Sequence, residues 1–447
     1  MANEWAGRRL HFVGVGGAGM SAYARAAHAL GAAVSGSDRA ESPFAAALAA
    51  DGVLEAAIGQ RAENVPSGAG VEVVCSSAIG ADNPERMAAL ERGLHVLTRA
   101  QLLAQLSELR RTIAVAGAHG KTTTAAMVVS ALRGGGLDPG YLIGGMLPET
   151  GRNGEWTSGE WLVVEADESD RSLLSLSVEI AVLTSVELDH HDAFGSLHEL
   201  EDVYRAFLGG ARQAVIWDRP ALRALRAGPL LAYDVPAPVL IAGGSRFRWQ
   251  GVEVELRVPG EHNARNAAAA LSVATLVGVD VADAARGLAT FTGAARRFER
   301  LGRTAAGAEV YDDYAHHPTE VAATLAAART LTPSRLVVVF QPHLYSRTRA
   351  LAREFGLALA GADTVVVLDI YPAREQAADF PGVRGLLLAE ATVDAAPGKP
   401  TYWLPDRDSA AATIAALTGP GDLVIVMGAG DIDRLGRELV AGGAEHG

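Results

Sequence analysis

The stretch that decides the fold is Ile113-Ala-Val-Ala-Gly-Ala-His-Gly-Lys-Thr-Thr-Thr124. An apolar, strand-like run leads into a glycine, a Gly-Lys-Thr sequence follows, and a helix-like segment from Ala125 to Leu132 comes next, which is the order typical of a phosphate-binding loop. Lys121 adds a positive charge, and the Thr122 hydroxyl can reach a magnesium ion. The usual pattern has an earlier glycine where this chain has Val115. Taken alone, the stretch therefore predicts a nucleotide site and leaves an incidental glycine turn as the alternative.

The composition indicates an α/β enzyme of about three domains, at roughly 150 residues per domain. The chain has 447 residues, of which 49% are hydrophobic and 20% are charged, and it contains 50 glycines. A net charge of −13 argues against broad nucleic-acid binding, which needs clustered basic residues. No apolar run approaches the ~20 residues of a membrane span, and no signal-peptide core is visible. With one cysteine, Cys75, expected to be a small core residue, we expect a cytoplasmic protein without membrane insertion.

A second glycine fingerprint lies near the N-terminus. Gly14, Gly16 and Gly19 fit the pattern G-x-G-x-x-G between an apolar strand and a helix-like segment, and Asp38 follows about 20 residues later. This spacing suggests NAD, but the same geometry serves any pyrophosphate, including that of a UDP-sugar, because it recognises charge at a helix N-terminus. A glycine turn without a ligand is the alternative.

Two strand ends in the middle of the chain are rich in oxygen ligands. The strand that begins at Trp161 ends in Glu165-Ala-Asp-Glu-Ser-Asp170, and the strand 180–186 ends in Glu187-Leu-Asp-His-His-Asp192. In an open parallel sheet these ends should meet the phosphate loop at one crevice, where carboxylates suit Mg²⁺. His190 and His191 have a second interpretation as polar loop residues. A zinc hydrolase is disfavoured because no His-Glu-x-x-His or paired Cys-x-x-Cys sequence is present.

The last third of the chain alternates strand and helix again after Gly293, which predicts a further domain. We expect strands at 335–340, 364–368 and 423–427. Three loops carry polar chemistry: Asp312-Asp-Tyr-Ala-His-His-Pro318, Gln341-Pro-His-Leu-Tyr-Ser-Arg-Thr-Arg349 and Gly428-Ala-Gly-Asp431. Arg347 could hold a carboxylate, since guanidinium matches it bidentately. Just before this segment, a helix opens with His262, Asn263 and Asn266, of which Asn263 suits a helix cap and Asn266 does so less well.

Taken together, these motifs closely resemble the Mur ligase family, in the branch that joins L-alanine to UDP-N-acetylmuramate. The motifs that carry the resemblance are Gly14 to Met20, Ala118-His-Gly-Lys-Thr-Thr123, Glu165-Ala-Asp-Glu-Ser-Asp170, His262-Asn-x-x-Asn266, Asp312-Asp-Tyr-x-His-His-Pro-Thr-Glu320 and Gln341-Pro-His. They follow the order of the family over essentially the whole chain, and Mur ligases carry the same shortened phosphate loop. The resemblance implies an α/β protein of three domains: a Rossmann-like UDP-sugar domain at 1–107, a central P-loop ATPase domain with a mostly parallel sheet at 108–293, and a Rossmann-like domain at 294–447.

The resemblance also implies a reaction and a set of site residues. ATP, with Mg²⁺, would phosphorylate the lactoyl carboxylate of UDP-N-acetylmuramate, and the amine of L-alanine would attack the acyl phosphate to give an amide, ADP and phosphate. By position, the catalytic residues are Lys121, Glu165 and His190; the metal ligands are Thr122, Glu165 and His190, with Glu168 as the second choice of carboxylate. The ATP contacts are Gly117, Gly120, Lys121, Thr122, Thr123, Asn266, Arg297, Asp313 and Tyr314. The UDP-sugar contacts are Gly16, Gly17, Gly19, Met20, Ser37, Asp38, Ser77 and His119, and the amino-acid contacts are His316 and Arg347.

One departure and several alternatives remain. Some members carry an arginine where this chain has Leu344, so Arg347 would hold the alanine carboxylate with less help. The nearest alternative is the recycling ligase that attaches a tripeptide to the same nucleotide sugar. An NAD-dependent dehydrogenase, which does not explain the second phosphate site, and a non-catalytic nucleotide switch that binds ATP without turnover are the others. We expect a monomer or weak homodimer.

Overall fold

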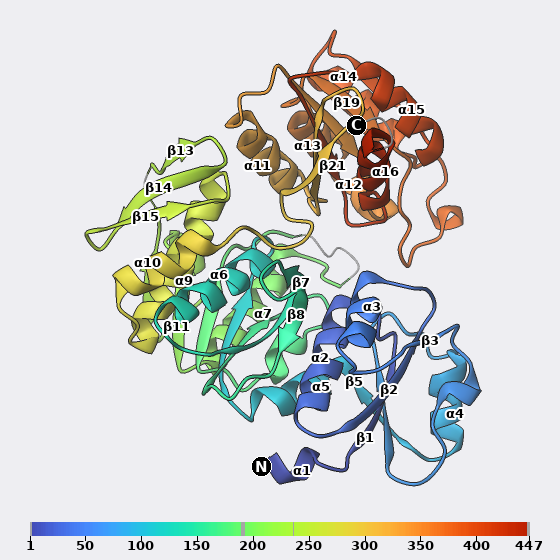
Figure 1. Ribbon diagram of the computed structural model, residues 1–447, viewed down its shortest axis with the longest axis vertical. Coiled ribbons are helices and arrows are strands. Elements are labelled where there is room, and N and C mark those ends of the chain that lie inside the picture. Colours follow the sequence, from blue (N-terminus) through green and yellow to red (C-terminus); the bar gives the residue numbers. More distant parts are fainter. Residues whose placement is uncertain (1, 189–192, 236, 445–447) are drawn as a thin grey trace. The chain divides into compact units, whose positions relative to one another are not determined.

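The computed structural model describes residues 2–188, 193–235 and 237–444, and these form four β-sheets with helices (Figure 1). The chain folds into two compact units. The first comprises residues 1–235, 249–254 and 265–291, and the second comprises residues 236–248, 255–264 and 292–447.

The first sheet consists of β1 (Arg9–Val13), β2 (Ala33–Asp38), β3 (Ala57–Ile58), β4 (Val71–Cys75) and β5 (His95–Thr98). All five strands are parallel, in the order β3-β2-β1-β4-β5. Leu10 and Phe12 face a core shared with α2 (Ala18–Ala29) and α5 (Arg99–Ser107), whereas Val13 and the buried Cys75 pack with α4 (Pro84–Glu91) on the other face. Burial of both faces explains the continuous apolar runs in the sequence. The remaining helices here are α1 (Ala2–Trp5), α3 (Pro43–Ala50) and a 3-10 turn at Ala62–Asn64.

The second sheet has seven strands: β6 (Arg111–Ala116), β7 (Gly140–Leu147), β8 (Arg152–Glu155), β9 (Trp161–Glu165), β10 (Ile180–Leu183), β11 (Gln213–Trp217) and β12 (Leu230–Tyr233). Their order is β12-β11-β10-β6-β9-β7-β8, and all pairs are parallel except β7 with β8. β6 therefore has β10 and β9 as neighbours, which brings their carboxyl ends together. Its helices are α6 (Lys121–Gly134), α7 (Leu197–Gly210), α8 (Pro220–Arg223), α10 (Val281–Thr290) and a 3-10 turn at Ser172–Ser175.

A small three-stranded sheet follows, with β13 (Val239–Ile241), β14 (Gly244–Trp249) and β15 (Val252–Leu256) in the order β13-β14-β15. The long helix α9 (Glu261–Val277) comes next along the chain, before α10.

The fourth sheet contains β16 (Glu299–Arg303), β17 (Glu309–Asp313), β18 (Arg335–Phe340), β19 (Thr364–Val367), β20 (Thr401–Trp403) and β21 (Asp422–Met427). The order is β16-β17-β21-β18-β19-β20, parallel except for the edge pair β16 with β17. Alternate residues of β18 face opposite cores: Val338 packs with α11 (Pro318–Arg329), α13 (Ala352–Leu359) and α14 (Leu386–Ala395), and Val339 packs with α15 (Arg407–Leu417) and α16 (Asp433–Ala444). The short helix α12 (Tyr345–Ala350) and a 3-10 turn at Ala377–Asp379 complete this part.

Two predicted element boundaries were wrong. The strand expected at 180–186 ends at Leu183, because residues after it turn to contact the phosphate loop. The helix expected from Ala125 begins at Lys121; its first turn contains Thr122, Thr123 and Thr124, whose β-branched side chains have low helix propensity and concealed the start. The predicted fold class is confirmed, and the domain boundaries at 107 and 293 stay predictions. Among the described residues, no helix is both long and apolar enough to cross a membrane.

Candidate active site

The phosphate loop consists of the four residues between β6 and α6. Gly117 has φ +131° and Gly120 has φ +79°, both in the region that favours glycine. Gly120 is the N-cap of α6 and offers no side chain to cap the first amides of the helix. Such amides, together with the helix dipole, attract an anion. The loop therefore has the backbone conformation that a phosphate site requires.

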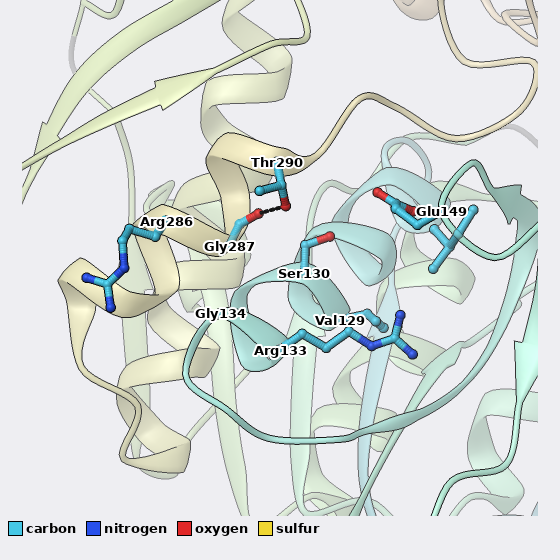
Figure 2. Close-up of a pocket in the computed structure, with 9 residues that line it drawn as sticks. Val129, Ser130, Arg133, Gly134, Glu149, Arg286, Gly287 and Thr290 are labelled. Carbon is cyan, nitrogen blue, oxygen red and sulfur yellow. Dashed lines mark hydrogen bonds between the residues drawn. The ribbon is translucent and has the colours of Figure 1, made fainter.

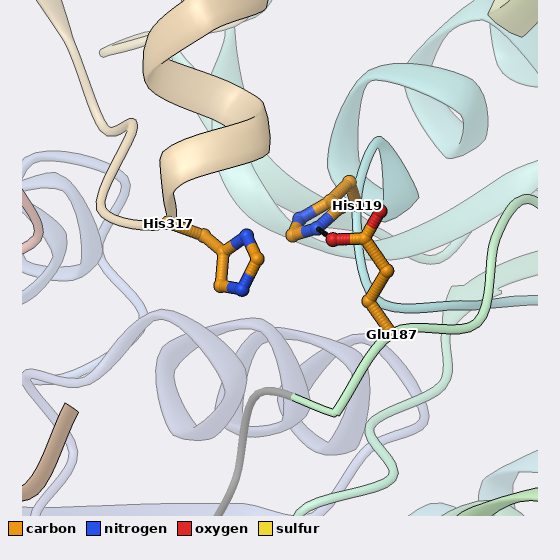
Figure 3. A group of neighbouring side chains, drawn as sticks. All are labelled: His119, Glu187 and His317. Carbon is orange, nitrogen blue, oxygen red and sulfur yellow. Dashed lines mark hydrogen bonds and ion pairs between the residues drawn. The ribbon is translucent and has the colours of Figure 1, made fainter. Parts of the chain in front are cut away.

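The residues after β10 hold this loop in place. The Thr184 hydroxyl donates to the His119 carbonyl at 2.6 Å, and the Ser185 hydroxyl accepts the His119 amide at 3.0 Å. The His119 ring also lies beside Glu187, with Nε2 and Oε2 3.0 Å apart (Figure 3). These contacts confirm that the end of β10 meets the phosphate loop. His190 lies outside the described residues, so its role as a metal ligand stays a prediction.

Lys121, the first residue of α6, is held by one carboxylate and one carbonyl. Its ammonium donates to both Glu168 oxygens at 3.0 Å and to the Gly117 carbonyl at 2.7 Å. Burial lowers the pKa of Lys121, but the nearby carboxylates of Glu168, Asp167 and Glu165 outweigh it and raise that pKa. Lys121 is therefore a fixed positive charge at neutral pH.

Glu165 occupies the end of β9 and meets the residue after Lys121. Its Oε2 accepts the Thr122 hydroxyl at 2.8 Å and the Gly144 amide at 2.8 Å. A hydroxyl and a carboxylate are hard oxygen donors, which is the set that Mg²⁺ prefers. Since Glu168 is buried at 2% exposure and paired with Lys121, Glu165 is the carboxylate better placed to share a magnesium ion with Thr122.

Asn266, in α9, lies against the phosphate loop. A Cβ added at Gly120 would come 2.8 Å from Asn266 Oδ1, so only glycine allows this approach. Asn263 is not the helix cap that its sequence position suggested. The helix begins earlier, at Glu261, and the side-chain amide of Asn263 donates to the Pro259 carbonyl at 2.8 Å.

The first glycine turn is organised by Asp38. The Gly16 amide donates to Asp38 Oδ2 at 2.7 Å, the Ser42 hydroxyl donates to the Gly16 carbonyl at 2.9 Å, and a Cβ at Gly16 would lie 2.8 Å from both side chains. Gly17 is the N-cap of α2, and no side chain caps that helix. Asp38 therefore shapes the turn through one oxygen, while its other oxygen accepts the Arg39 amide at 2.7 Å.

The other predicted UDP-sugar contacts have contrasting environments. Ser37 is completely buried, and its hydroxyl donates to Glu85 at 2.7 Å. Met20 packs in the core at 2% exposure, Gly19 lies in the first turn of α2, and Ser77 is exposed in the loop after β4. Side-chain contact with a ligand is thus open to Ser77, whereas the side chains of Ser37 and Met20 are buried.

The loops of the fourth sheet bring a second group of predicted residues together. Asp313 accepts the amides of Phe298 at 2.8 Å and Ala315 at 2.7 Å. The guanidinium of Arg297 lies over the Tyr314 ring, 5.1 Å from its centroid. Arg297 and Phe298, which precede β16, are thus held against Asp313 and Tyr314 at the end of β17.

His343 contacts both His316 and Arg347, the two residues predicted to bind the amino acid. His316 Nδ1 lies 2.8 Å from the Tyr314 carbonyl and donates to it, and the same nitrogen lies 3.4 Å from Glu320 Oε2. The His316 and His343 rings meet edge to face with centroids 5.9 Å apart. Arg347, only 3% exposed, has Nη1 3.2 Å from His343 Nδ1. His343 belongs to the Gln341-Pro-His motif, but nothing in the sequence had marked it as a site residue.

Known proteins resemble this chain throughout its length. Residues 9–111 match the profile described as Mur ligase family, catalytic domain, and residues 296–430 match the one described as Mur ligase, glutamate ligase domain. A UDP-N-acetylmuramate--L-alanine ligase from Mycobacterium sp. (strain JLS) is 44% identical, covering 97% of this chain and 95% of that relative. The ligase of the same name from Thermobifida fusca is also 44% identical, covering 97% and 96%. The chain belongs to the Mur ligase family.

Solved structures agree with this membership. The crystal structure of UDP-N-acetylmuramate-alanine ligase from Thermotoga maritima matches with a TM-score of 0.83 and 26% identity, over 97% of this chain and 98% of that one. A murein peptide ligase from Psychrobacter arcticus matches with a TM-score of 0.74 over 98% of both chains, and at 22% identity it shows the shared fold alone. The three-domain Mur ligase fold expected from the sequence is therefore confirmed.

A pocket of about 300 Å³ in this Mur ligase lies at the C-terminal end of α6 (Figure 2). Helix α6 has 14 residues, so its two ends are about 20 Å apart and the pocket is remote from the phosphate loop. Its two arginines already have partners: Arg133 donates to Glu155 at 2.7 Å, and Arg286 pairs with Asp283. None of the predicted site residues lines this pocket, and we assign it no part in the reaction.

We expect Asp312 of this Mur ligase to make folding stability depend on pH. Asp312 is completely buried, and burial raises its pKa to about 7 although Arg296 lies 3.2 Å away and lowers it. The folded chain therefore takes up a proton as the pH falls through about 7, while an unfolded Asp does so only near 4. Stability should rise as the pH falls from about 8 to about 5, by about 2 kcal/mol. Thermal unfolding across this range measures the effect.

The matched variants for that measurement are Asp312→Asn and Asp422→Asn, both in strands of the fourth sheet. Asp312→Asn should reduce the rise and leave the smaller part that comes from Asp313, whose pKa is raised by burial to about 6. The Asp422 carboxylate is bound by Arg335, which lowers its pKa, so it contributes stability above about pH 4 that is lost only at lower pH. Asp422→Asn should leave the slope between pH 5 and 8 unchanged. If Asp312→Asn kept the wild-type dependence of stability on pH, another group would have to cause that dependence.

Proposed function

We propose that this chain is an ATP-dependent ligase that joins L-alanine to the lactoyl carboxylate of UDP-N-acetylmuramate, giving ADP and phosphate, in the synthesis of peptidoglycan precursors. The observation that carries the proposal is the pairing at one strand end of Lys121 with Glu168 and of Thr122 with Glu165, beside a phosphate-type loop. The 44% identity to ligases of this name supports the same substrates.

The chemistry explains why such a site is needed. A carboxylate resists attack by an amine, because it is negatively charged and has no good leaving group. Transfer of the terminal phosphoryl group of ATP to the lactoyl carboxylate gives an acyl phosphate. The alanine nitrogen then forms a bond to the acyl carbon, the bond from that carbon to the phosphate oxygen breaks, and the amine loses a proton. Negative charge gathers on phosphate oxygens in both steps, so fixed cations beside them lower the barrier.

The residues of the phosphate loop supply this stabilisation. Lys121 places its ammonium at the loop, and the amides of the loop and of the start of α6 bind phosphate oxygens. Thr122 and Glu165, with His190, would hold Mg²⁺, which when bound offsets charge on the phosphates. Asn266, which lies against Gly120, suits a contact to the adenine of ATP.

The fourth sheet supplies the remaining proposed contacts. Arg297, Asp313 and Tyr314 suit ATP, and Arg347 suits the carboxylate of L-alanine because its planar guanidinium can bind both oxygens. His316 is the second proposed contact to the amino acid. We further propose that the enzyme acts in the cytoplasm as a monomer or weak homodimer.

Phosphate release tests the proposal. Purified protein is incubated with ATP, Mg²⁺ and a panel of UDP-N-acetylmuramate with L-alanine, glycine, L-serine or the murein tripeptide. We expect release only when both the nucleotide sugar and an amino acid are present, with L-alanine giving the highest kcat/KM. Faster turnover with the tripeptide would identify a recycling ligase instead. Nicotinamide absorbance changes with an alcohol or acid substrate would favour a dehydrogenase.

A further inference from the structure

Arg99 is the first residue of α5, directly after the last strand of the first sheet. A capping box fixes the backbone there: the Thr98 hydroxyl accepts the Gln101 amide at 3.2 Å, and Gln101 Oε1 accepts the Thr98 amide at 2.8 Å. The Arg99 side chain is 17% exposed, so it extends from a rigid support into the protein.

The Arg99 guanidinium binds the acidic turn after β9 at two points. Its Nε donates to Asp170 Oδ2 at 2.6 Å, and its Nη2 donates to Asp167 Oδ2 at 3.1 Å. The remaining oxygens brace the turn itself: Asp167 Oδ1 accepts the Ser169 amide at 2.9 Å, and Asp170 Oδ1 accepts the Ser172 amide at 3.0 Å. One guanidinium thus fixes a turn that is already internally hydrogen-bonded.

This acidic turn also contains the partners of the phosphate loop. Glu165 begins it and accepts the Thr122 hydroxyl, and Glu168, next to Asp167, accepts the Lys121 ammonium. A displacement of the turn relative to α6 would change both contacts. Arg99 therefore contacts the segment that sets the position of the Lys121 ammonium.

On its other side, Arg99 lies against the start of α2. A Cβ added at Gly19 would come 3.2 Å from Arg99 Nη1 and 3.7 Å from the Tyr23 hydroxyl. Gly19 belongs to the first turn of α2, immediately after the glycine turn to which we assign the nucleotide sugar. The guanidinium therefore occupies the junction of the sugar-binding turn and the acidic turn.

We propose that Arg99 is a positioning residue that couples binding of the nucleotide sugar at the 14–20 turn to the geometry of the acidic turn, and hence to the phosphate loop. The inference rests on the proposed function. A ligand that shifts the start of α2 displaces the guanidinium packed on it, and the two aspartates follow. A lysine cannot replace the arginine, because a single ammonium lacks the fixed fork that reaches two carboxylates at once.

Calorimetric titration of a non-hydrolysable ATP analogue, with and without UDP-N-acetylmuramate, measures this coupling. In the wild type we expect the nucleotide sugar to raise analogue affinity at least about fivefold, a typical coupling between two sites. In Arg99→Lys and Arg99→Gln the factor should fall below about twofold, and kcat should fall about 10-fold to 100-fold, with analogue affinity in the absence of the sugar unchanged. Thermal unfolding checks that the variants fold.

Arg111 provides the matched control. It also bridges two carboxylates, Glu160 at 3.1 Å and Glu179 at 3.0 Å, but at the opposite end of β6. Arg111→Lys should keep the wild-type coupling factor and kcat. Wild-type coupling in Arg99→Lys, or no coupling in the wild type, would overturn the inference. The inference would also be overturned if the Arg99 variants melted at a lower temperature but kept the wild-type coupling, because Arg99 would then only stabilise the fold. Failure of the proposed function is distinguishable, because the wild type would then release no phosphate with its three substrates.

Discussion

Lys121→Ala is expected to lower kcat by about 1,000-fold or more, with all substrates saturating. The ammonium at the start of α6 is the positive charge placed at the phosphate loop, and charge on the transferring phosphoryl group develops there. The substitution should also destabilise the fold by about 3 kcal/mol, because Glu168, at 2% exposure, loses its ammonium partner. Phosphate release and thermal unfolding measure the two effects.

A double variant separates the two effects of losing Lys121. Lys121→Ala combined with Glu168→Gln removes the buried charge as well as its partner, so stability should recover in part while turnover stays low. Lys399 is the other lysine of the chain and donates to the Ala362 carbonyl in the second unit. Lys399→Ala should retain the wild-type kcat. Near wild-type turnover in Lys121→Ala would show that this loop does not bind the reacting phosphate.

The sequence predicted the phosphate loop and its acidic partners because both are local patterns at strand ends. Val115, which departs from the usual loop pattern, has a structural explanation. It is a fully buried residue of β6, in register with Glu165 of β9 and Val182 of β10. The strand continues to Ala116, so the loop begins only at Gly117. Position 115 lies inside the strand, where no turn requires a glycine.

The residues that the sequence could not reveal act across long separations. Thr184 and Ser185, just after the end of β10, hold the loop from about 65 residues later in the chain, and Arg99 reaches an acidic turn about 70 residues later. The sequence around Arg99 looks like that of any exposed arginine at the start of a helix. Its partners, Asp167 and Asp170, come close only because of the way α5 packs. The different contacts of Glu165 and Glu168 could not be predicted either, because both follow the same strand. In the structure Glu165 contacts Thr122 and Glu168 contacts Lys121.

Gly117→Ala is expected to reduce kcat at least about 100-fold and to destabilise the fold by about 3 kcal/mol. A Cβ at Gly117 would lie 2.2 Å from Thr184 Oγ1 and 2.8 Å from the Ser185 amide, so the end of β10 must move away from the loop. The backbone φ of +131° adds strain that only glycine avoids. Steady-state phosphate release and thermal unfolding measure the result.

Gly136→Ala is the matched control, at the other end of α6. Gly136 also has a positive φ, +78°, but a Cβ there meets no atom within 4 Å. Its substitution should cost about 1 kcal/mol of stability through backbone strain and leave kcat unchanged. If Gly117→Ala behaved like Gly136→Ala, the close approach of Thr184 and Ser185 would not be needed to shape the loop. A large loss of kcat in Gly117→Ala alone would instead mean that the loop works only while it is held against the end of β10.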